Sequence, residues 1–359
     1  MFTKKMAAFV ILISTAIFTH ANADNSHNEA RADSHAPIGV MAEHMHKKGE
    51  WMFSYRYMHM DMKDNGNGSS DISANSIATA IPNRFFGLPG QPPTLRVVPT
   101  QMTTEMHMFG LMHAPSDDLT MMVMLPFVKK TMDHITYMGG MGTTVLGGFT
   151  TKAEGVGDLK ISGLYRLLDQ GMHHWHANVG LSLPTGSNTE TGTILAPTGA
   201  TPTVRLPYPM QLGSGTYDIL AGLTYSGKID DYSWGAQYSG TFRTGSDEGY
   251  TLGDVHKVTG WVQKLLNPNT AISARLNYLD AGNISGIDPT IVLPVQTADP
   301  DRQGKERVDL AIGLTLLGTQ GDFKGQRLAF EASQPLHQNL EGPQLKSDLM
   351  ITVGYQQAW

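Results

Sequence analysis

The chain has 359 residues, a formal net charge of −6, 39 glycines and no cysteine. The absence of cysteine excludes a disulfide framework and any thiolate metal site. The acidic balance argues against nucleic acid as a partner, since such partners select basic surfaces.

The N-terminal residues have the pattern of a secretory signal. Two lysines precede an apolar run over residues 6–18, and Ala-Asn-Ala at 21–23 fits a small-x-small cleavage motif. The run has about 13 residues and covers only ~20 Å of a ~30 Å hydrocarbon core, which is too short for a membrane anchor. We therefore predict a signal peptide over residues 1–23, a periplasmic segment containing histidine and methionine over 24–46, and a barrel over 47–359.

The rest of the chain alternates apolar and polar residues with period two, which is typical of half-buried strands. From position 234 to 243 one face carries Trp234, Ala236, Tyr238 and Phe242, and the other carries Gln237, Ser239, Thr241 and Arg243. The polar faces carry full charges in mid-strand. Such residues suit the wet lumen of a membrane barrel, whereas in a soluble periplasmic sandwich or lectin, the alternative fold, they would face bulk water.

The alternation predicts an all-β fold: a transmembrane antiparallel β-barrel of about twelve strands. The strands are expected at 51–62, 98–112, 119–131, 157–168, 174–184, 215–227, 232–244, 250–265, 270–281, 306–317, 326–336 and 347–359. Short turns alternate with long loops at 63–97, 132–156, 185–214 and 282–305, an asymmetry typical of outer-membrane barrels.

The end of the chain should close the barrel. An open sheet edge in hydrocarbon would leave backbone groups unpaired, so the last strand must pair with the first. The terminal Trp359 resembles the signal by which outer-membrane barrels are recognised. The expected location is therefore the cell outer membrane of a Gram-negative bacterium, with its lipid and the barrel assembly machinery as partners.

Three short motifs occur in order at strand ends: Gly155-Val-Gly-Asp-Leu159, Leu183-Pro-Thr-Gly-Ser187 and Gly213-Ser-Gly-Thr-Tyr-Asp218. Their order and spacing resemble the outer-membrane "transporter" family labelled MetA-pathway of phenol degradation, from about residue 47 to the end. The resemblance implies traffic in small aromatic or hydrophobic molecules and supplies no catalytic residues. The segments around Ser34 and from Glu43 to Trp51 depart from that family pattern.

Methionine and histidine are concentrated in the first part of the mature chain. Sixteen methionines lie between Met41 and Met141. Thioether and imidazole ligands without thiolates suit copper, and no other cofactor is indicated. The candidate metal ligands are His44, His46, Met58, Met60, Met62, His107, His174 and His176. In the alternative interpretation, methionine only fills an irregular lumen as a flexible hydrophobe.

The charged residues expected to line the lumen are of both signs. They are Arg56, Glu105, Lys160, Arg166, Arg243, Arg275, Arg307, Asp309 and Glu331. In the second strand, Glu105 and His107 are expected to point inward and Met106 and Met108 outward.

We expect a narrow channel for a small-molecule solute, partly occluded by the long loops or by residues 24–46. A copper-binding or copper-transporting barrel is the alternative. An outer-membrane enzyme ranks last, because the sequence lacks Gly-x-Ser-x-Gly and His-Glu-x-x-His motifs.

Overall fold

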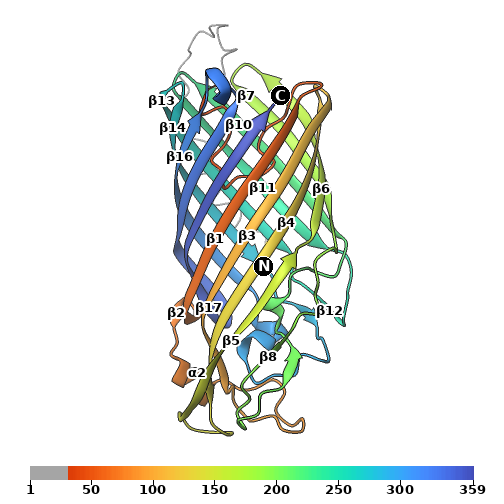
Figure 1. Cartoon of the computed structure of the whole chain (residues 1–359), viewed down its shortest axis with the longest axis vertical. Helices are drawn as coiled ribbons and strands as arrows, with labels where there is room; N and C mark the ends of the chain where they lie inside the picture. Colours follow the sequence, from red (N-terminus) through yellow and green to blue (C-terminus); the bar gives the residue numbers. More distant parts are fainter. Residues whose placement is uncertain (1–30) are drawn as a thin grey trace, which may run out of the picture.

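A computed structural model describes residues 31–359, so the predicted signal peptide and residues 24–30 lie outside the described part. The described chain forms a tall, closed antiparallel β-barrel (Figure 1). Among residues 31–359, no helix is long and apolar enough to cross a membrane.

Eleven strand elements form the closed ring, each paired with its neighbours in chain order. They are β1 (Trp51–Gly68), β3 (Val97–Ser116), β4 (Leu119–Tyr137), β6 (Leu159–Gln170), β7 (His173–Leu183), β10 (Asp218–Ile229), β11 (Tyr232–Arg243), β13 (Val255–Asn267), β14 (Thr270–Ala281), β16 (Lys305–Leu317) and β17 (Gln326–Ala358).

The element β17 crosses the barrel wall twice. Its residues 327–340 pair with β16 and its residues 340–358 pair with β1, both antiparallel. Between the two halves, Gly342 adopts a left-handed φ of 92°, which a turn at this point requires. Ten single passes and one double pass give twelve, so the predicted barrel of about twelve strands is confirmed.

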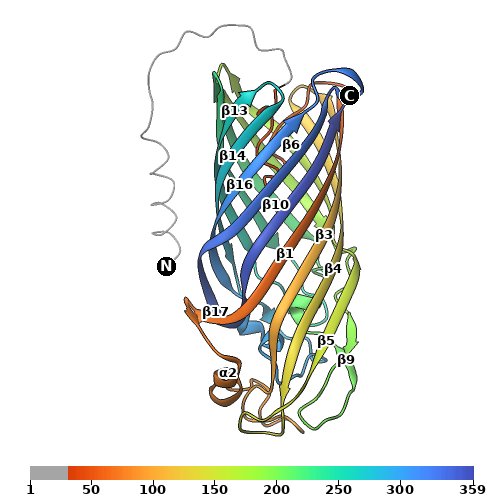
Figure 2. The same cartoon turned by 60° about the vertical axis from the view of Figure 1, so that its left-hand side comes forward.

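One predicted loop is wrong. Residues 132–156 are mostly strand, because β4 extends to Tyr137 and β5 (Val145–Val156) pairs with that extension. β4 pairs with β5 and with β6 in registers that differ by only one residue. β5 and β6 therefore form one long strand with a break at 157–158. The wall therefore extends further toward the bottom of Figure 2 on this side, where β5 lies beside β4, and we call this part the raised wall.

The loops at the two ends differ in size. The short turns lie at the end where Trp51 and the C-terminus meet, which we take as the periplasmic end. The long loops gather at the opposite, extracellular end. They carry the helix α2 (Ala74–Ala80), the helical turns η1 (Tyr208–Met210), η2 (Gln296–Ala298) and η3 (Pro300–Arg302), and the short strands β2 (Ser70–Asp71), β8 (Thr191–Thr193), β9 (Thr203–Arg205), β12 (Tyr250–Thr251) and β15 (Ser285–Gly286). The helical turn η4 (Gly321–Phe323) lies in the periplasmic link before β17.

The extracellular loops share an apolar core of their own. Its buried members come from loops that are far apart in sequence: Phe85, Val97, Ile194, Tyr208, Tyr250, Ile284, Ile291, Leu293, Val295 and Ala298. Burial of this apolar surface stabilises the loops as a cover over one end of the barrel.

The outer face of the wall is apolar. Exposed large side chains alternate along the strands, among them Phe109, Leu111, Val123, Leu125, Val179, Leu181, Val262, Ile272, Leu276, Ile312 and Leu314. This belt suits contact with lipid, as on the outer faces of transmembrane β-barrels.

Candidate functional site

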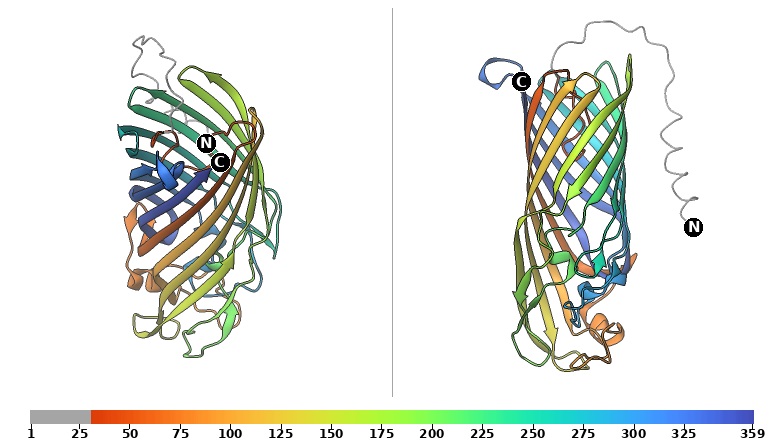
Figure 3. Two further views of the ribbon diagram at one scale, coloured as in Figure 1. Left: turned by 45° about the horizontal axis from the view of Figure 1, so that its top comes forward. Right: turned by 90° about the vertical axis from the view of Figure 1, so that its right-hand side faces the viewer.

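Residues 31–50 run inside the barrel at its periplasmic end, and we call this segment the plug. It contains turns and bends but no helix or strand. Figure 3 shows it as the dark red coil within the ring of strands. The chain then leaves the lumen and enters β1 at Trp51.

Barrel side chains from four strands donate hydrogen bonds to backbone carbonyls of the plug. Gln263 donates to His35 O at 2.7 Å, Arg327 to Ala36 O at 2.7 Å, Gln237 to Met41 O at 2.8 Å, and His176 to Ala42 O at 2.9 Å. On a fifth strand, Thr120 Oγ1 accepts from the amide of His46 at 3.0 Å. An irregular segment buried in a lumen must satisfy its backbone in this way.

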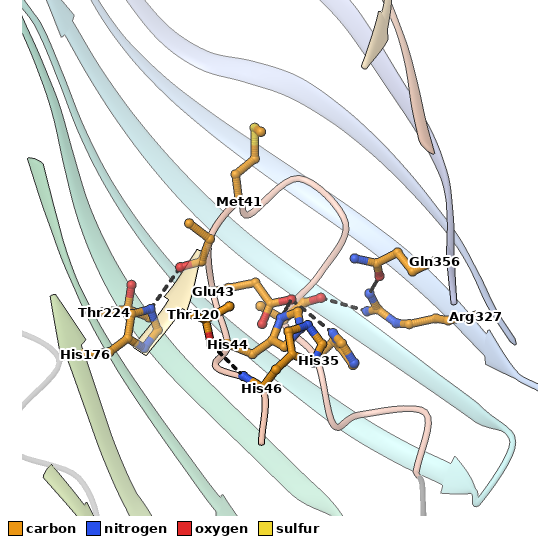
Figure 4. A network of polar contacts seen from close by, with 12 residues as sticks. His35, Met41, Glu43, His44, His46, Thr120, His176, Thr224, Arg327 and Gln356 are labelled. Carbon is orange, nitrogen blue, oxygen red and sulfur yellow. Dashed lines mark hydrogen bonds and ion pairs between the residues drawn. The ribbon is translucent and has the colours of Figure 1, made fainter. Parts of the chain in front are cut away.

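A cluster of histidines around one carboxylate lies on the plug (Figure 4). The Glu43 carboxylate accepts from His35 Nδ1 at 3.3 Å and from His44 Nδ1 at 2.7 Å. The other ring nitrogen of His44, Nε2, lies 3.1 Å from His46 Nε2. His46 Nδ1 in turn lies 3.4 Å from Glu50 Oε2. The ligand atoms of His35, Glu43 and His44 are within 4.8 Å of one another, close enough to share one metal ion.

Burial controls the ionisation of this cluster. It lowers the pKa of His35 and of His44, and it lowers the pKa of His46 to about 4. Burial alone would raise the pKa of Glu43, but its interactions with His44 and His35 outweigh burial and hold that pKa well below its usual range. At neutral pH the cluster is therefore a carboxylate surrounded by neutral imidazoles, which is the protonation state that binds metals.

The structure reverses the expected faces of β3. Tyr57 pairs with His107 and Met58 with Met106, and directly paired residues point to the same side of a sheet. Since Arg56 and Met58 face the lumen, Met106 and Met108 face it too, and Glu105 and His107 lie on the outer face. There Glu105 accepts from Tyr57 Oη at 2.8 Å and lies 3.5 Å from Lys129 Nζ.

With this correction, methionines line the lumen on three adjacent strands. They meet in cross-strand pairs, Met52 with Met112, Met58 with Met106, Met62 with Met102, Met112 with Met122, and Met102 with Met132. Two apolar clusters result, one around Met52, Met112 and Met122, the other around Met102, Met132 and Met210. The first borders a cavity of about 20 Å³ that is also lined by Glu43, His44 and Arg56.

Of the eight residues expected to bind metal, the structure brings only His44 and His46 together. His176 is buried beside the plug backbone, His174 contacts Asp169 near the periplasmic rim, and His107 hydrogen-bonds Tyr55 on the outer face. Met62 packs in an apolar cluster, Met60 lies beside Arg307 and Asp309, and Met58 faces Met106. Sequence reasoning missed His35 and Glu43, although both lie in the segments that depart from the family pattern.

The expected lumen charges are mostly compensated by neighbours. Arg275 Nη2 lies 2.6 Å from Glu331 Oε1, and Arg307 Nε lies 2.8 Å from Asp309 Oδ1. Arg243 pairs with Asp218, and Arg166 pairs with Asp169. Lys160 and Arg56 also belong to the inward faces of their strands, and Arg56 is buried.

A second candidate site lies at the extracellular end, away from the plug. It is a cavity of about 390 Å³ between the loops and the raised wall of β4 and β5. The lining is predominantly apolar and includes Pro92, Phe149, Ile194, Val204, Val292 and Leu293. His134 is one of four residues with polar side chains in the lining. Its ring stacks on that of Phe149, with the centroids 4.6 Å apart.

No family model and no curated protein sequence matches this chain. Its fold is similar to that of the COG4313 outer membrane channel from Pseudomonas putida F1, with a TM-score of 0.54 at 14% identity over 89% of this chain and 99% of that one. A FadL homologue from Pseudomonas aeruginosa matches with a TM-score of 0.43 at 10% identity over 86% and 90% of the two chains. The toluene transporter TodX from Pseudomonas putida matches with a TM-score of 0.43 at 10% identity over 87% and 90%. The likeness to the COG4313 channel shows that the chain has the fold of an outer-membrane barrel, and the resemblance to the MetA-pathway family stays a prediction.

Proposed function

We propose that the protein is an outer-membrane channel that admits small apolar or aromatic molecules through the cavity at its extracellular end. The single observation that carries this proposal is the chemistry of that cavity. Its volume of about 390 Å³ falls within the range of small-molecule sites, roughly 300–1,000 Å³. Its lining contains no lysine, arginine, aspartate or glutamate, so it favours an uncharged solute.

Exposed apolar side chains in the loops that line the cavity support the same proposal. Phe86 is 64% exposed and precedes the lining residue Gly90, and Met141 is 80% exposed and follows the lining residue Gly140. Exposed apolar groups next to an apolar cavity would capture a poorly soluble molecule before it enters. The fold likeness to an outer membrane channel is in keeping with this use.

Filling the cavity tests the proposal. Ala196 lines it, whereas Ala200 in the same loop is exposed and outside the lining. Cells carrying Ala196→Trp should take up radiolabelled toluene several-fold more slowly than cells carrying the parent protein. Ala200→Trp, the same change in the same loop, should leave uptake unchanged at equal amounts of protein in the outer membrane. Equal uptake by all three proteins would refute the proposal.

A further inference from the structure

We propose that the plug binds one divalent copper ion, held by His35 Nδ1, the Glu43 carboxylate and His44 Nδ1. The inference is independent of the proposed solute channel. Two features of the described residues support it: the spacing of the three ligand groups, and a methionine-lined cavity beside them.

The spacing fits one metal ion. Two ligands bound to the same ion at about 2.0 Å lie ~2.8–3.3 Å apart, depending on the coordination geometry. Glu43 Oε1 lies 3.3 Å from His35 Nδ1 and 2.7 Å from His44 Nδ1. All three residues belong to one short segment whose backbone is fixed by Gln263, Arg327 and His176, so the ligands are held in place before the ion arrives.

The contacts of His44 continue past the three ligands. Its Nε2 lies 3.1 Å from His46 Nε2, and His46 Nδ1 lies 3.4 Å from Glu50 Oε2. A metal ion at His44 Nδ1 replaces the proton that this nitrogen donates to Glu43. Then His44 Nε2–H donates to His46, and His46 Nδ1–H donates to Glu50. This chain of contacts orients a metal-binding imidazole in the usual way.

Two considerations favour copper among the divalent ions. Imidazole and carboxylate ligands bind Cu(II) more tightly than Zn(II) or Ni(II). The cavity of about 20 Å³ next to Glu43 and His44 is lined by the methionines Met41, Met52, Met108, Met112, Met122 and Met124. Thioether sulfur binds copper, chiefly in its Cu(I) state, whereas zinc sites in proteins rarely use it.

The same contacts also permit a purely structural role. Arg56 and Arg327 interact electrostatically with Glu43, and in that role the carboxylate only anchors the plug. Both guanidinium groups would repel a cation and weaken its binding. Measurement of metal binding separates the two roles, because an anchor needs no ion.

The experiment uses the full-length mature protein, folded in detergent, stripped with EDTA and titrated with Cu(II) at neutral pH. We expect one tightly bound equivalent in the parent. His44→Gln should lose it, while His107→Gln, the same change on the outer face, should keep it. Heat-modifiable migration in gels establishes that each variant is folded, and His35→Gln replaces His44→Gln if the latter does not fold.

The ligand assignment has its own readout. The electron paramagnetic resonance spectrum of bound Cu(II) should show coupling to two imidazole nitrogens in both the parent and His46→Gln. The affinity of His46→Gln should fall by ~10–100-fold, as for other residues that orient a ligand. Absence of binding by the parent, unchanged binding by folded His44→Gln or His35→Gln, or loss of one nitrogen coupling in His46→Gln would overturn the proposal. Zinc binding at least as tight as copper binding would overturn the choice of metal.

Discussion

At Gly39 the plug passes beside a buried ion pair. A Cβ at this position would lie 2.1 Å from Glu331 Oε1 and 2.4 Å from Arg275 Nη2. Arg275 and Glu331 form an almost fully buried, bidentate ion pair, with nitrogen–oxygen distances of 2.6 and 3.1 Å. Separating buried partners is costly, so the ion pair resists moving and the plug backbone would have to yield.

Gly39→Ala should therefore displace the plug without unfolding the barrel. We expect a higher single-channel conductance in planar bilayers than for the parent protein. Ser34→Ala changes an exposed residue of the same segment and should leave the conductance as it is. If Gly39→Ala conducts no better than Ser34→Ala, then the ion pair adapts and the plug stays in place.

At the level of single residues, sequence reasoning succeeded where one face of a strand was plainly apolar. It failed on β3, where methionine and histidine alternate and either face could be the apolar one. Pairing with β1 decides the matter, since Met58 faces the lumen and fixes Met106 beside it. The partnership of His35 with Glu43 was equally hidden, because residues eight apart in an irregular segment have no defined relation in sequence.

Among the elements, the plug contributes most to the state of the lumen. It is held both by polar contacts to its backbone and by apolar contacts such as those of Val40 and Ala36 with Trp261. It forms no hydrogen-bonded ladder with the described barrel strands. Its removal should therefore leave the wall intact while clearing the periplasmic end.

Deletion of residues 31–46 should raise ion conductance and leave heat-modifiable migration unchanged. The barrel retains every strand pairing in this variant, so its assembly does not depend on the deleted segment. Liposome swelling with a small sugar provides the measurement for uncharged solutes. If the deleted protein is as tight as the parent to ions and to sugar, the extracellular loops alone close the lumen.

Sequence periodicity predicted strands better than it predicted loops. The raised part of the wall was missed because β5 contains Gly147, Gly148 and Gly155, and glycine and threonine there resemble a loop. In the structure Gly147 and Gly148 pair with the extension of β4, and the lack of side chains at Gly147 and Gly155 permits close approach of Leu195 and Leu212. Alternation of apolar and polar residues indicates which face of a strand contacts lipid. The β5 glycines contact loop residues instead, so the sequence contains no such signal there.

The molecule as a whole separates an apolar exterior from a filled interior that holds its buried charges. The belt of exposed apolar residues and the buried charges of Arg275, Asp309 and Glu331 lie on opposite faces of the same wall. Period-two alternation records this separation directly, which is why the twelve passes could be predicted from sequence. Occlusion by the long loops or by residues 24–46 was also expected, but the contacts that hold the plug and the loop cover could not be predicted, because they join distant segments.

A matched pair of substitutions in the middle of β14 tests this separation. Leu276 is 41% exposed on the outer face, and its neighbour Asn277 faces the lumen, where it donates to Asp309 at 3.2 Å. Leu276→Arg places a charge in lipid and should reduce the free energy of unfolding by ~2–4 kcal/mol if it lies near the bilayer midplane. Asn277→Arg places the same charge beside the Asp309 carboxylate and should be tolerated. Urea unfolding in lipid vesicles, followed by heat-modifiable migration, measures both. Equal losses for the two variants would mean that the assigned faces of β14 are wrong.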